Sequence, residues 1–113
     1  MTTVTFHSAG GRLDGFAVEG HSGYAEEGSD IVCAAVSAAV GLTECTINEV
    51  MGVGAAVKAD EKRARFSLKL PSAMNEESES LCQNTLDGLM VYLRSLGEEY
   101  PDNLTVLLDD DDD

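Results

Sequence analysis

Positive charge is scarce in this chain of 113 residues. It has 7 Lys and Arg against 21 Asp and Glu, which gives a formal net charge of −14 at pH 7. Nucleic-acid binding uses Lys and Arg to neutralise phosphates, and anionic membranes attract basic segments. We therefore expect neither a nucleic acid nor a membrane as a partner, and the charge favours a basic partner or substrate. The same acidity also keeps a protein soluble, so it does not identify a partner alone.

Cysteine and histidine are too few for a metal centre. The chain has 3 Cys and 2 His and no CxxC pair, so we expect no metal and no other cofactor. Cys33, Cys45 and Cys82 lack disulfide-type spacing and are predicted to be reduced thiols. No stretch approaches the roughly 18–20 uninterrupted apolar residues of a membrane helix. The first residues lack the basic start and apolar run of a secretion signal. These observations predict a cytoplasmic protein.

Alternating and helical apolar patterns predict elements in the order ββαββαβ. The predicted elements are strands over 2–7 and 13–20, a helix over about 31–50, strands over 55–58 and 63–70, a helix from Asn75 to Gly97, and a strand over 103–108. We interpret this order as a single α+β domain over residues 1–108, with a mixed β-sheet covered by two α-helices. Residues 109–113 are five consecutive Asp, which we expect to form a disordered acidic tail.

Two apolar patterns are expected to build the core. Val4 and Phe6 alternate with polar residues on the first strand, where His7 is expected to face solvent. Residues of the second helix repeat at four-three spacing, which predicts a buried stripe, part of which is also a candidate dimer interface. The stripe consists of Cys82, Leu86, Leu89, Leu93 and Leu96. Cys45, like Cys82, is predicted to be a packing residue.

Residues 20–37 carry the candidate chemistry. Ser29 or Asp30 is a candidate cap for the first helix, and if Asp30 is the cap, Cys33 falls at the third helical position. Unsatisfied N–H groups and the positive end of the helix dipole there favour a thiolate, and the same N–H groups suit an oxyanion. His21 ends the preceding strand, and the loop is long enough to fold back, so His21 is a candidate general base. Ser37 lies one helical turn beyond Cys33, on the same face.

Each of these residues also has an ordinary structural explanation. A cysteine in an Ala-rich helix is most often a small buried hydrophobe, and a histidine beside glycines is most often a surface residue. Ser37 in mid-helix usually bonds the preceding turn. Asp30 usually serves as a cap. Composition and spacing therefore leave both explanations open.

The same segment resembles the signature of a known family. Gly-His-Ser-Gly-Tyr-Ala, a short loop with glycine, and then Asp-Ile-Val-Cys-Ala-Ala-Val-Ser are similar to the motif of the bacterial ribosomal-processing cysteine proteases, the Prp family. The resemblance covers about residues 2–108. It implies a homodimer with a catalytic dyad of His21 and Cys33, and supporting roles for Asp30 and Ser37. The implied substrate loop, which orders over the substrate, contains Gly20, Ser22, Gly23, Tyr24 and Gly28.

The resemblance also implies a reaction. The family removes a short N-terminal extension from a large-subunit ribosomal protein, cutting just after paired aromatic residues. Basic ribosomal termini suit a chain of charge −14, and a glycine-rich loop suits a site that closes on binding. The Ala-rich start of the first helix, with Tyr24, is a candidate wall for an aromatic side chain. Two alternatives are a non-catalytic dimeric ribosome-assembly factor that binds a basic peptide, and a thiol switch in which Cys33 senses oxidation.

Overall fold

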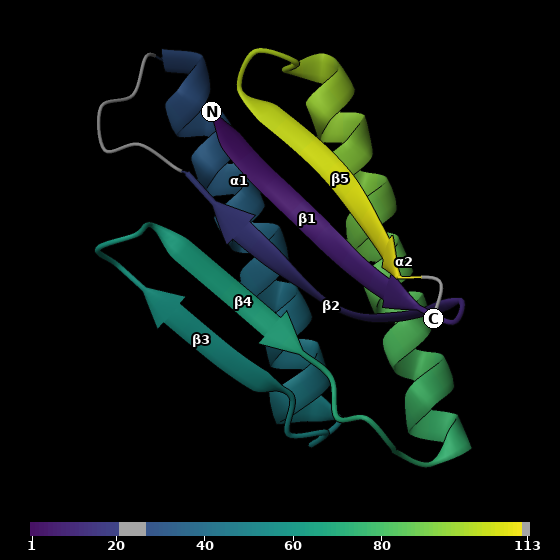
Figure 1. The fold of residues 1–113 in the computed structure, drawn as a ribbon. Helices are drawn as coiled ribbons and strands as arrows, with labels where there is room; N and C mark the ends of the chain where they lie inside the picture. The colour runs from purple at the N-terminus through teal and green to yellow at the C-terminus, as the bar shows by residue number, and fades with distance from the viewer. Residues whose placement is uncertain (21–26, 112–113) are drawn as a thin grey trace.

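The structure is a computed structural model that describes residues 1–20 and 27–111, without the side chains of residues 27–30. Five strands form one mixed sheet in the order β3-β4-β2-β1-β5, in which only β1 and β5 are parallel (Figure 1). The elements are β1 (Thr2–Ala9), β2 (Arg12–Glu19), α1 (Glu27–Glu44), a π-helical segment (Cys45–Val50), β3 (Ala56–Asp60), β4 (Arg65–Lys69), α2 (Glu76–Glu99) and β5 (Leu104–Asp111). The predicted α+β fold and its order ββαββαβ are confirmed, with shifted element bounds.

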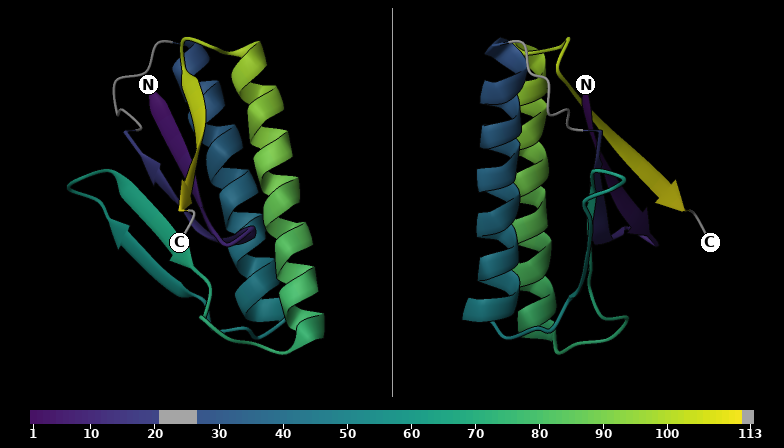
Figure 2. Two further views of the ribbon diagram at one scale, coloured as in Figure 1. Left: turned by 45° about the vertical axis from the view of Figure 1, so that its right-hand side comes forward. Right: turned by 90° about the vertical axis from the view of Figure 1, so that its left-hand side faces the viewer.

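Both helices cover the same face of the sheet, and the opposite face is open (Figure 2). The core lies between these two layers because each element turns its apolar positions towards it. Val4 and Phe6 of β1 are fully buried, as their alternation predicts. From α1, Val32, Val36 and Val40 meet them at helical spacing.

The predicted stripe of α2 is buried along its whole length, so it cannot also be a dimer interface. Asn75 caps this helix as predicted, because its side chain accepts a hydrogen bond from the N–H of Ser78 at 2.8 Å. The prediction that the helix ends at Gly97 is wrong, since α2 continues to Glu99. A Cβ at Gly97 would lie 3.3 Å from the carbonyl oxygen of Leu104, so close approach of β5 explains this glycine.

Glycines shape the first hairpin and its contact with β4. Gly10 and Gly11 have φ of 61° and 79°, as a two-residue turn between twisted strands requires. Gly15 is needed for a different reason: a Cβ there would lie 2.2 Å from the carbonyl oxygen of Leu68. Pairing of β2 with β4 therefore depends on a missing side chain at this position.

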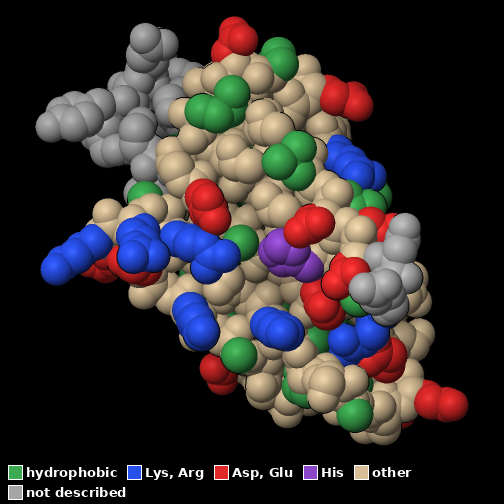
Figure 3. Space-filling model, in the orientation of Figure 1, with side chains coloured by type: hydrophobic (Ala, Val, Ile, Leu, Met, Phe, Trp, Pro, Cys, Tyr) green, Lys and Arg blue, Asp and Glu red, His purple; other side chains and the backbone are tan. Residues whose placement is uncertain are grey.

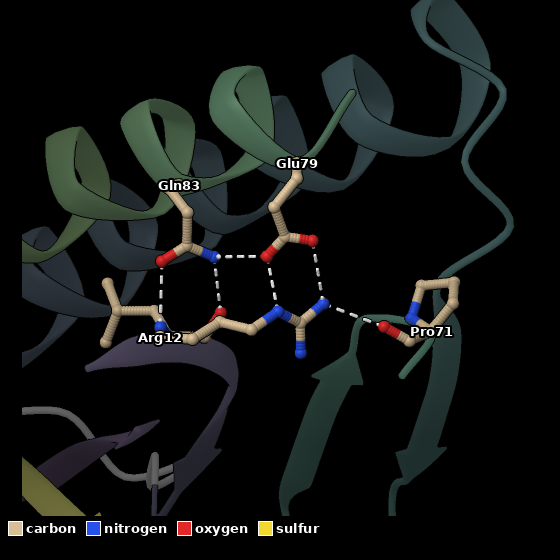
Figure 4. Close-up of polar contacts among 5 residues, drawn as sticks. Arg12, Pro71, Glu79 and Gln83 are labelled. Carbon is tan, nitrogen blue, oxygen red and sulfur yellow. Dashed lines mark hydrogen bonds and ion pairs between the residues drawn. The ribbon is translucent and has the colours of Figure 1, made fainter. Parts of the chain in front are cut away.

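A polar cluster fastens the first hairpin to the start of α2 (Figure 4). Arg12 donates to the carboxylate of Glu79 and, at 2.8 Å, to the carbonyl of Pro71. Gln83 accepts from the N–H of Leu13 at 2.8 Å and donates to its carbonyl at 2.7 Å. The hydrogen bond to Glu79 raises the pKa of Arg12, which keeps the guanidinium charged. The cluster therefore holds β2 and α2 together at one end of the sheet.

The prediction of a disordered tail after Leu108 is wrong for residues 109–111. These aspartates continue β5, in parallel register with β1 as far as Ala9. Ser8 donates to the carboxylate of Asp110 at 2.5 Å, and His7 lies 3.4 Å from that of Asp109. The backbone hydrogen bonds that these residues gain by pairing with β1 thus outweigh the repulsion between their like charges. His7 is 44% exposed on the open face, and residues 112–113 lie outside the described part of the chain.

One helical stretch is long and apolar enough to cross a membrane by length and composition alone. It covers Ile31–Val50, with a mean hydropathy of 1.6, and 28% of it is buried. A core helix of a soluble protein passes the same test. Here the buried positions of this stretch, Val32, Val36 and Ile47 among them, pack in the core against the sheet. The packing is thus that of a core helix.

Candidate active site

The structure describes some of the predicted site residues and leaves others out. His21, Ser22, Gly23 and Tyr24 lie outside the described residues. Gly20 directly follows β2, and the backbones of Gly28 and Asp30 belong to the start of α1. Cys33 and Ser37 lie further along α1, where their side chains are described as half-buried and exposed, respectively. Of the proposed dyad, only Cys33 is therefore described.

Cys33 does not stand at the end of its helix. Because α1 begins at Glu27, Cys33 is its seventh residue, and neither Ser29 nor Asp30 is the residue that precedes the helix. The prediction of a third helical position is therefore wrong. Small and acidic residues are favoured in a first turn as well as at a cap, so they continue this helix. The free N–H groups of a helix end belong to its first four residues, and they do not include that of Cys33.

Cys33 has a side-chain hydroxyl on β1 as its polar neighbour, in place of the free N–H groups of a helix end. Thr2 Oγ1 lies 3.8 Å from Cys33 Sγ, and Thr2 is only 3% exposed. The backbone of Thr2 is fixed as well, since its N–H donates to the carbonyl of Asn103 at 2.8 Å. This contact of Thr2 with Cys33 was not predicted from the sequence. The available signal was a polar residue at an inward position of a strand, in register with Val4 and Phe6.

The end of β2 reaches the same corner of the sheet. Gly20 has a φ of 82°, and its N–H donates to the carbonyl of Ala64 at 3.1 Å. A Cβ on Gly20 would lie 2.8 Å from the carbonyl oxygen of Met1. The chain therefore leaves the sheet towards position 21 beside the residue that precedes Thr2. Sequence positions 20 and 33 thus converge on the first residues of β1.

A groove of about 280 Å³ runs along α1 from the turn that follows Cys33. Val18 and Phe66 of the sheet form an apolar wall, and Ser37 lies on the α1 side. The other lining residues are Val36, Val40, Gly41, Glu44, Ala59, Asp60, Glu61, Ala64 and Arg65. The groove is thus apolar in its floor and acidic along part of its rim. Its wall lies further along α1 than the Ala-rich start that the sequence suggested.

The three cysteines differ in their surroundings. Cys82 is buried as predicted, and burial raises its pKa, so it stays a protonated thiol. Cys45 is exposed, so the prediction of a packing role for it is wrong. Cys33 alone is half-buried beside a hydroxyl and next to a groove. Among residues 1–20 and 31–111, no group of three or more His, Cys, Asp or Glu side chains could hold a metal ion.

A thiol that is partly accessible, hydrogen-bonded and one helical turn before a groove fits the class of cysteine hydrolases. Comparison with known families then specifies the class. The model of the family described as "Cysteine protease Prp" matches residues 1–105. The chain belongs to this family and is a cysteine protease, which confirms the resemblance seen in residues 20–37.

Individual relatives agree with this assignment. The chain is 30% identical over 91 residues to a ribosomal processing cysteine protease Prp of Bacillus subtilis, covering 80% of this chain and 81% of that protein. A Prp structure from Staphylococcus aureus with a covalently linked product peptide has a TM-score of 0.79 at 26% identity, covering 96% of this chain and 99% of that one. SMU.848 from Streptococcus mutans has a TM-score of 0.86 at 25% identity, covering 98% and 96%.

Proposed function

We propose that this protease removes the N-terminal extension of a bacterial large-subunit ribosomal protein, with Cys33 as nucleophile and His21 as general base. The observation that carries the proposal is the half-buried Cys33 thiol beside Thr2, one helical turn before Ser37, which lines the groove. The names of the Bacillus and Staphylococcus relatives, ribosomal processing cysteine proteases, support the substrate class. We also propose that the protein acts in the cytoplasm.

The chemistry follows the usual course of acyl transfer by a thiol. His21 takes the proton from Cys33 Sγ, and the thiolate attacks the scissile carbonyl carbon to form a tetrahedral intermediate. Collapse breaks the peptide C–N bond, and His21 gives its proton to the leaving amine, which leaves a thioester on Cys33. Water, deprotonated by His21, then hydrolyses the thioester and releases the new carboxylate. Thr2 donates a hydrogen bond to the sulfur whenever it is anionic.

The groove suits a peptide with an apolar residue followed or preceded by basic ones. Its apolar wall of Val18 and Phe66 accepts an aromatic side chain. On the α1 side, the carboxylate of Glu44 attracts a cationic side chain, whereas Asp60 on the opposite side is already paired with Arg63. We keep the proposed supporting roles of Asp30 and Ser37. Ser37 has the stronger support, because it lines the groove one helical turn from Cys33. Of the proposed substrate loop of Gly20, Ser22, Gly23, Tyr24 and Gly28, the described Gly20 lies at the same corner of the sheet.

The homodimer is proposed to form through the outer side of the two helices. The large apolar side chains exposed there are Ile31, Leu42, Val91 and Tyr92, with 52%, 69%, 64% and 54% exposure. This surface replaces the buried stripe of α2 that the sequence suggested. Leu42→Glu is expected to shift the protein to monomer in analytical ultracentrifugation, because a charge at the centre of an apolar interface is costly. An unchanged sedimentation coefficient would rule out this surface.

Peptide cleavage tests the proposal directly. The purified protein is incubated with a peptide that carries the ribosomal extension, and fragments are measured by mass spectrometry. Wild type and Cys45→Ala are expected to cut the peptide at the same rate, while Cys33→Ala and His21→Ala lose cleavage. A binding factor would retain the peptide without turnover, and a thiol switch would ignore the peptide while Cys33 is oxidised. Undiminished cleavage by Cys33→Ala contradicts the proposed nucleophile.

A further inference from the structure

The few cations of this chain are concentrated on one hairpin. Five of its 7 Lys and Arg residues lie on β3, β4 or the turn between them, which together we call the basic hairpin. They are Lys58, Lys62, Arg63, Arg65 and Lys69. With Asp60 and Glu61 included, the basic hairpin has a charge of +3, and the remainder of the chain has −17. A sum over the whole sequence conceals this separation.

The basic hairpin occupies one edge of the sheet and faces away from the helices. All five residues of β3 are exposed. Lys58 is paired with Ser67 and Lys69 with Gly15, so Lys58, Arg65 and Lys69 share the open face of the sheet. Figure 3 views this face and shows most of the Lys and Arg side chains gathered on one side of it, with acidic side chains beside them and across the rest of the face.

Three of the five cations are available to a ligand. Arg65 is paired with Glu19 at 2.9 Å, and Arg63 lies 3.8 Å from Asp60. Among the described side chains, Lys58, Lys62 and Lys69 take part in no ion pair. Beside Lys58 and Lys69 the open face is hollowed, with a volume of about 510 Å³, and Asp14, Asp109 and Asp111 line the same hollow. The end of the basic hairpin that carries Lys62 lies outside this lining.

The acidic edge of the sheet lies opposite the basic hairpin, although Asp109 and Asp111 share the hollow with Lys58 and Lys69. β5, with residues 109–111, is the other edge strand, and three strands separate it from β3. At about 4.8 Å per strand, the two edges are about 19 Å apart. Charges more than about 8 Å apart in water are largely screened at physiological salt. The outer edge of the basic hairpin, with Lys62 at its turn and Lys58 on β3, therefore attracts an anion at close range although the whole chain is acidic.

We propose that the basic hairpin binds the phosphate backbone of RNA and so holds the protease near its substrate. The proposal rests on the proposed function, because a ribosomal protein is found together with RNA. The face that carries Lys58, Arg65 and Lys69 exposes no large apolar side chain on β3 or β4, whereas a protein interface needs an apolar core. Without an exposed aromatic side chain on these strands, bases are not stacked and recognition is independent of sequence.

Fluorescence anisotropy with a labelled single-stranded RNA oligonucleotide of mixed sequence tests the proposal. Cys33→Ala is the background, so that the result does not depend on proteolysis. With three contacting lysines and a slope of about −0.7 per phosphate, affinity is expected to fall about 18-fold between 50 and 200 mM salt. No saturable binding at 50 mM salt would overturn the proposal even if the peptide is cleaved normally.

Matched charge reversals locate the surface. Lys58→Glu and Lys62→Glu are each expected to weaken RNA binding at least about fivefold. Arg94→Glu makes the same change in net charge at an exposed position of α2, away from the basic hairpin. It is expected to leave the affinity for RNA within about twofold. Circular dichroism confirms that each variant is folded, and cleavage of a free peptide is expected to stay unchanged in all three. Equal losses in Lys58→Glu and Arg94→Glu, or stronger competition by polyglutamate than by unlabelled RNA, would refute RNA as the partner.

Discussion

Replacing Thr2 with valine removes one hydroxyl from the site and keeps the shape of the side chain. The hydroxyl is buried, with 3% exposure, and lies 3.8 Å from Cys33 Sγ. When the sulfur is a neutral thiol, the lost bond is weak, and a methyl group at a buried position compensates for it. When the sulfur is an anion, the lost bond is charge-assisted. The substitution therefore acts selectively on the reactive form of the cysteine.

The expected size of the effect follows from this difference. Hydrogen bonds to charged groups contribute about 1.5–3 kcal/mol, and sulfur is a weak acceptor, so we take the lower value. About 1.5 kcal/mol corresponds to roughly a tenfold change in an equilibrium constant. We expect Thr2→Val to lower the rate of Cys33 alkylation at neutral pH roughly tenfold. In peptide cleavage, kcat is expected to fall by a similar factor while KM changes little.

The assay uses a Cys45→Ala background, because Cys45 is exposed and would react as well. Thr2→Ser is the matched control: it keeps the hydroxyl and should alkylate within about twofold of the background. The midpoint of thermal unfolding is expected to be nearly the same in all three proteins. If folded Thr2→Val alkylates as fast as the background, Thr2 has no role at the sulfur. If Thr2→Ser is as slow as Thr2→Val, the effect comes from packing instead.

Three further predictions concern the fold around the site. Gly15→Ala is expected to lower the unfolding midpoint strongly or prevent folding, because its Cβ would lie 2.2 Å from a carbonyl oxygen. Gly88→Ala on α2 is the control: its Cβ meets nothing within 4 Å, and the variant should be more stable by up to about 1 kcal/mol. Equal midpoints for the two variants would show that the β2–β4 approach is not tight. Native protein treated with a thiol reagent near pH 8 should be labelled at the exposed Cys45 first and at Cys82 only after denaturation, because burial raises the pKa of Cys82. Mass spectrometry of tryptic peptides reports the order of labelling. Leu93→Ala, at a fully buried position, should cost about 2–5 kcal/mol in urea denaturation, and a cost below 1 kcal/mol would mean that α2 does not pack as described.

The sequence predicts those parts of the fold in which local pattern and packing agree. The four-three spacing of α2 and its cap at Asn75 point to the same helix, and both are confirmed. Strand β5 was predicted too short because five aspartates in a row favour disorder locally. Their pairing with β1, a partner about a hundred positions away, is a tertiary effect that no window of sequence contains.

In the candidate site, too, a local sequence motif could be recognised, whereas tertiary contacts could not be predicted. Residues 20–37 carry a long motif, so the family was recognisable from sequence alone. The start of α1 was misplaced because Ser29 and Asp30 fit a first turn as well as a cap. Thr2 was missed because its contact with Cys33 joins residues far apart in the chain. The basic hairpin was missed because net charge is a sum, and its distribution over a surface depends on the fold.

Pairing between β1 and β5 also decides when Thr2 can take its place beside Cys33 during synthesis. Thr2 is held by the carbonyl of Asn103 and by its ladder partner Leu104. A nascent chain leaves the ribosome from its N-terminus, so β1 and Cys33 emerge long before β5 does. Until that late strand docks, the hydroxyl has no fixed position beside the sulfur. The contact between Thr2 and the proposed nucleophile therefore depends on a strand that is made about 70 residues after Cys33.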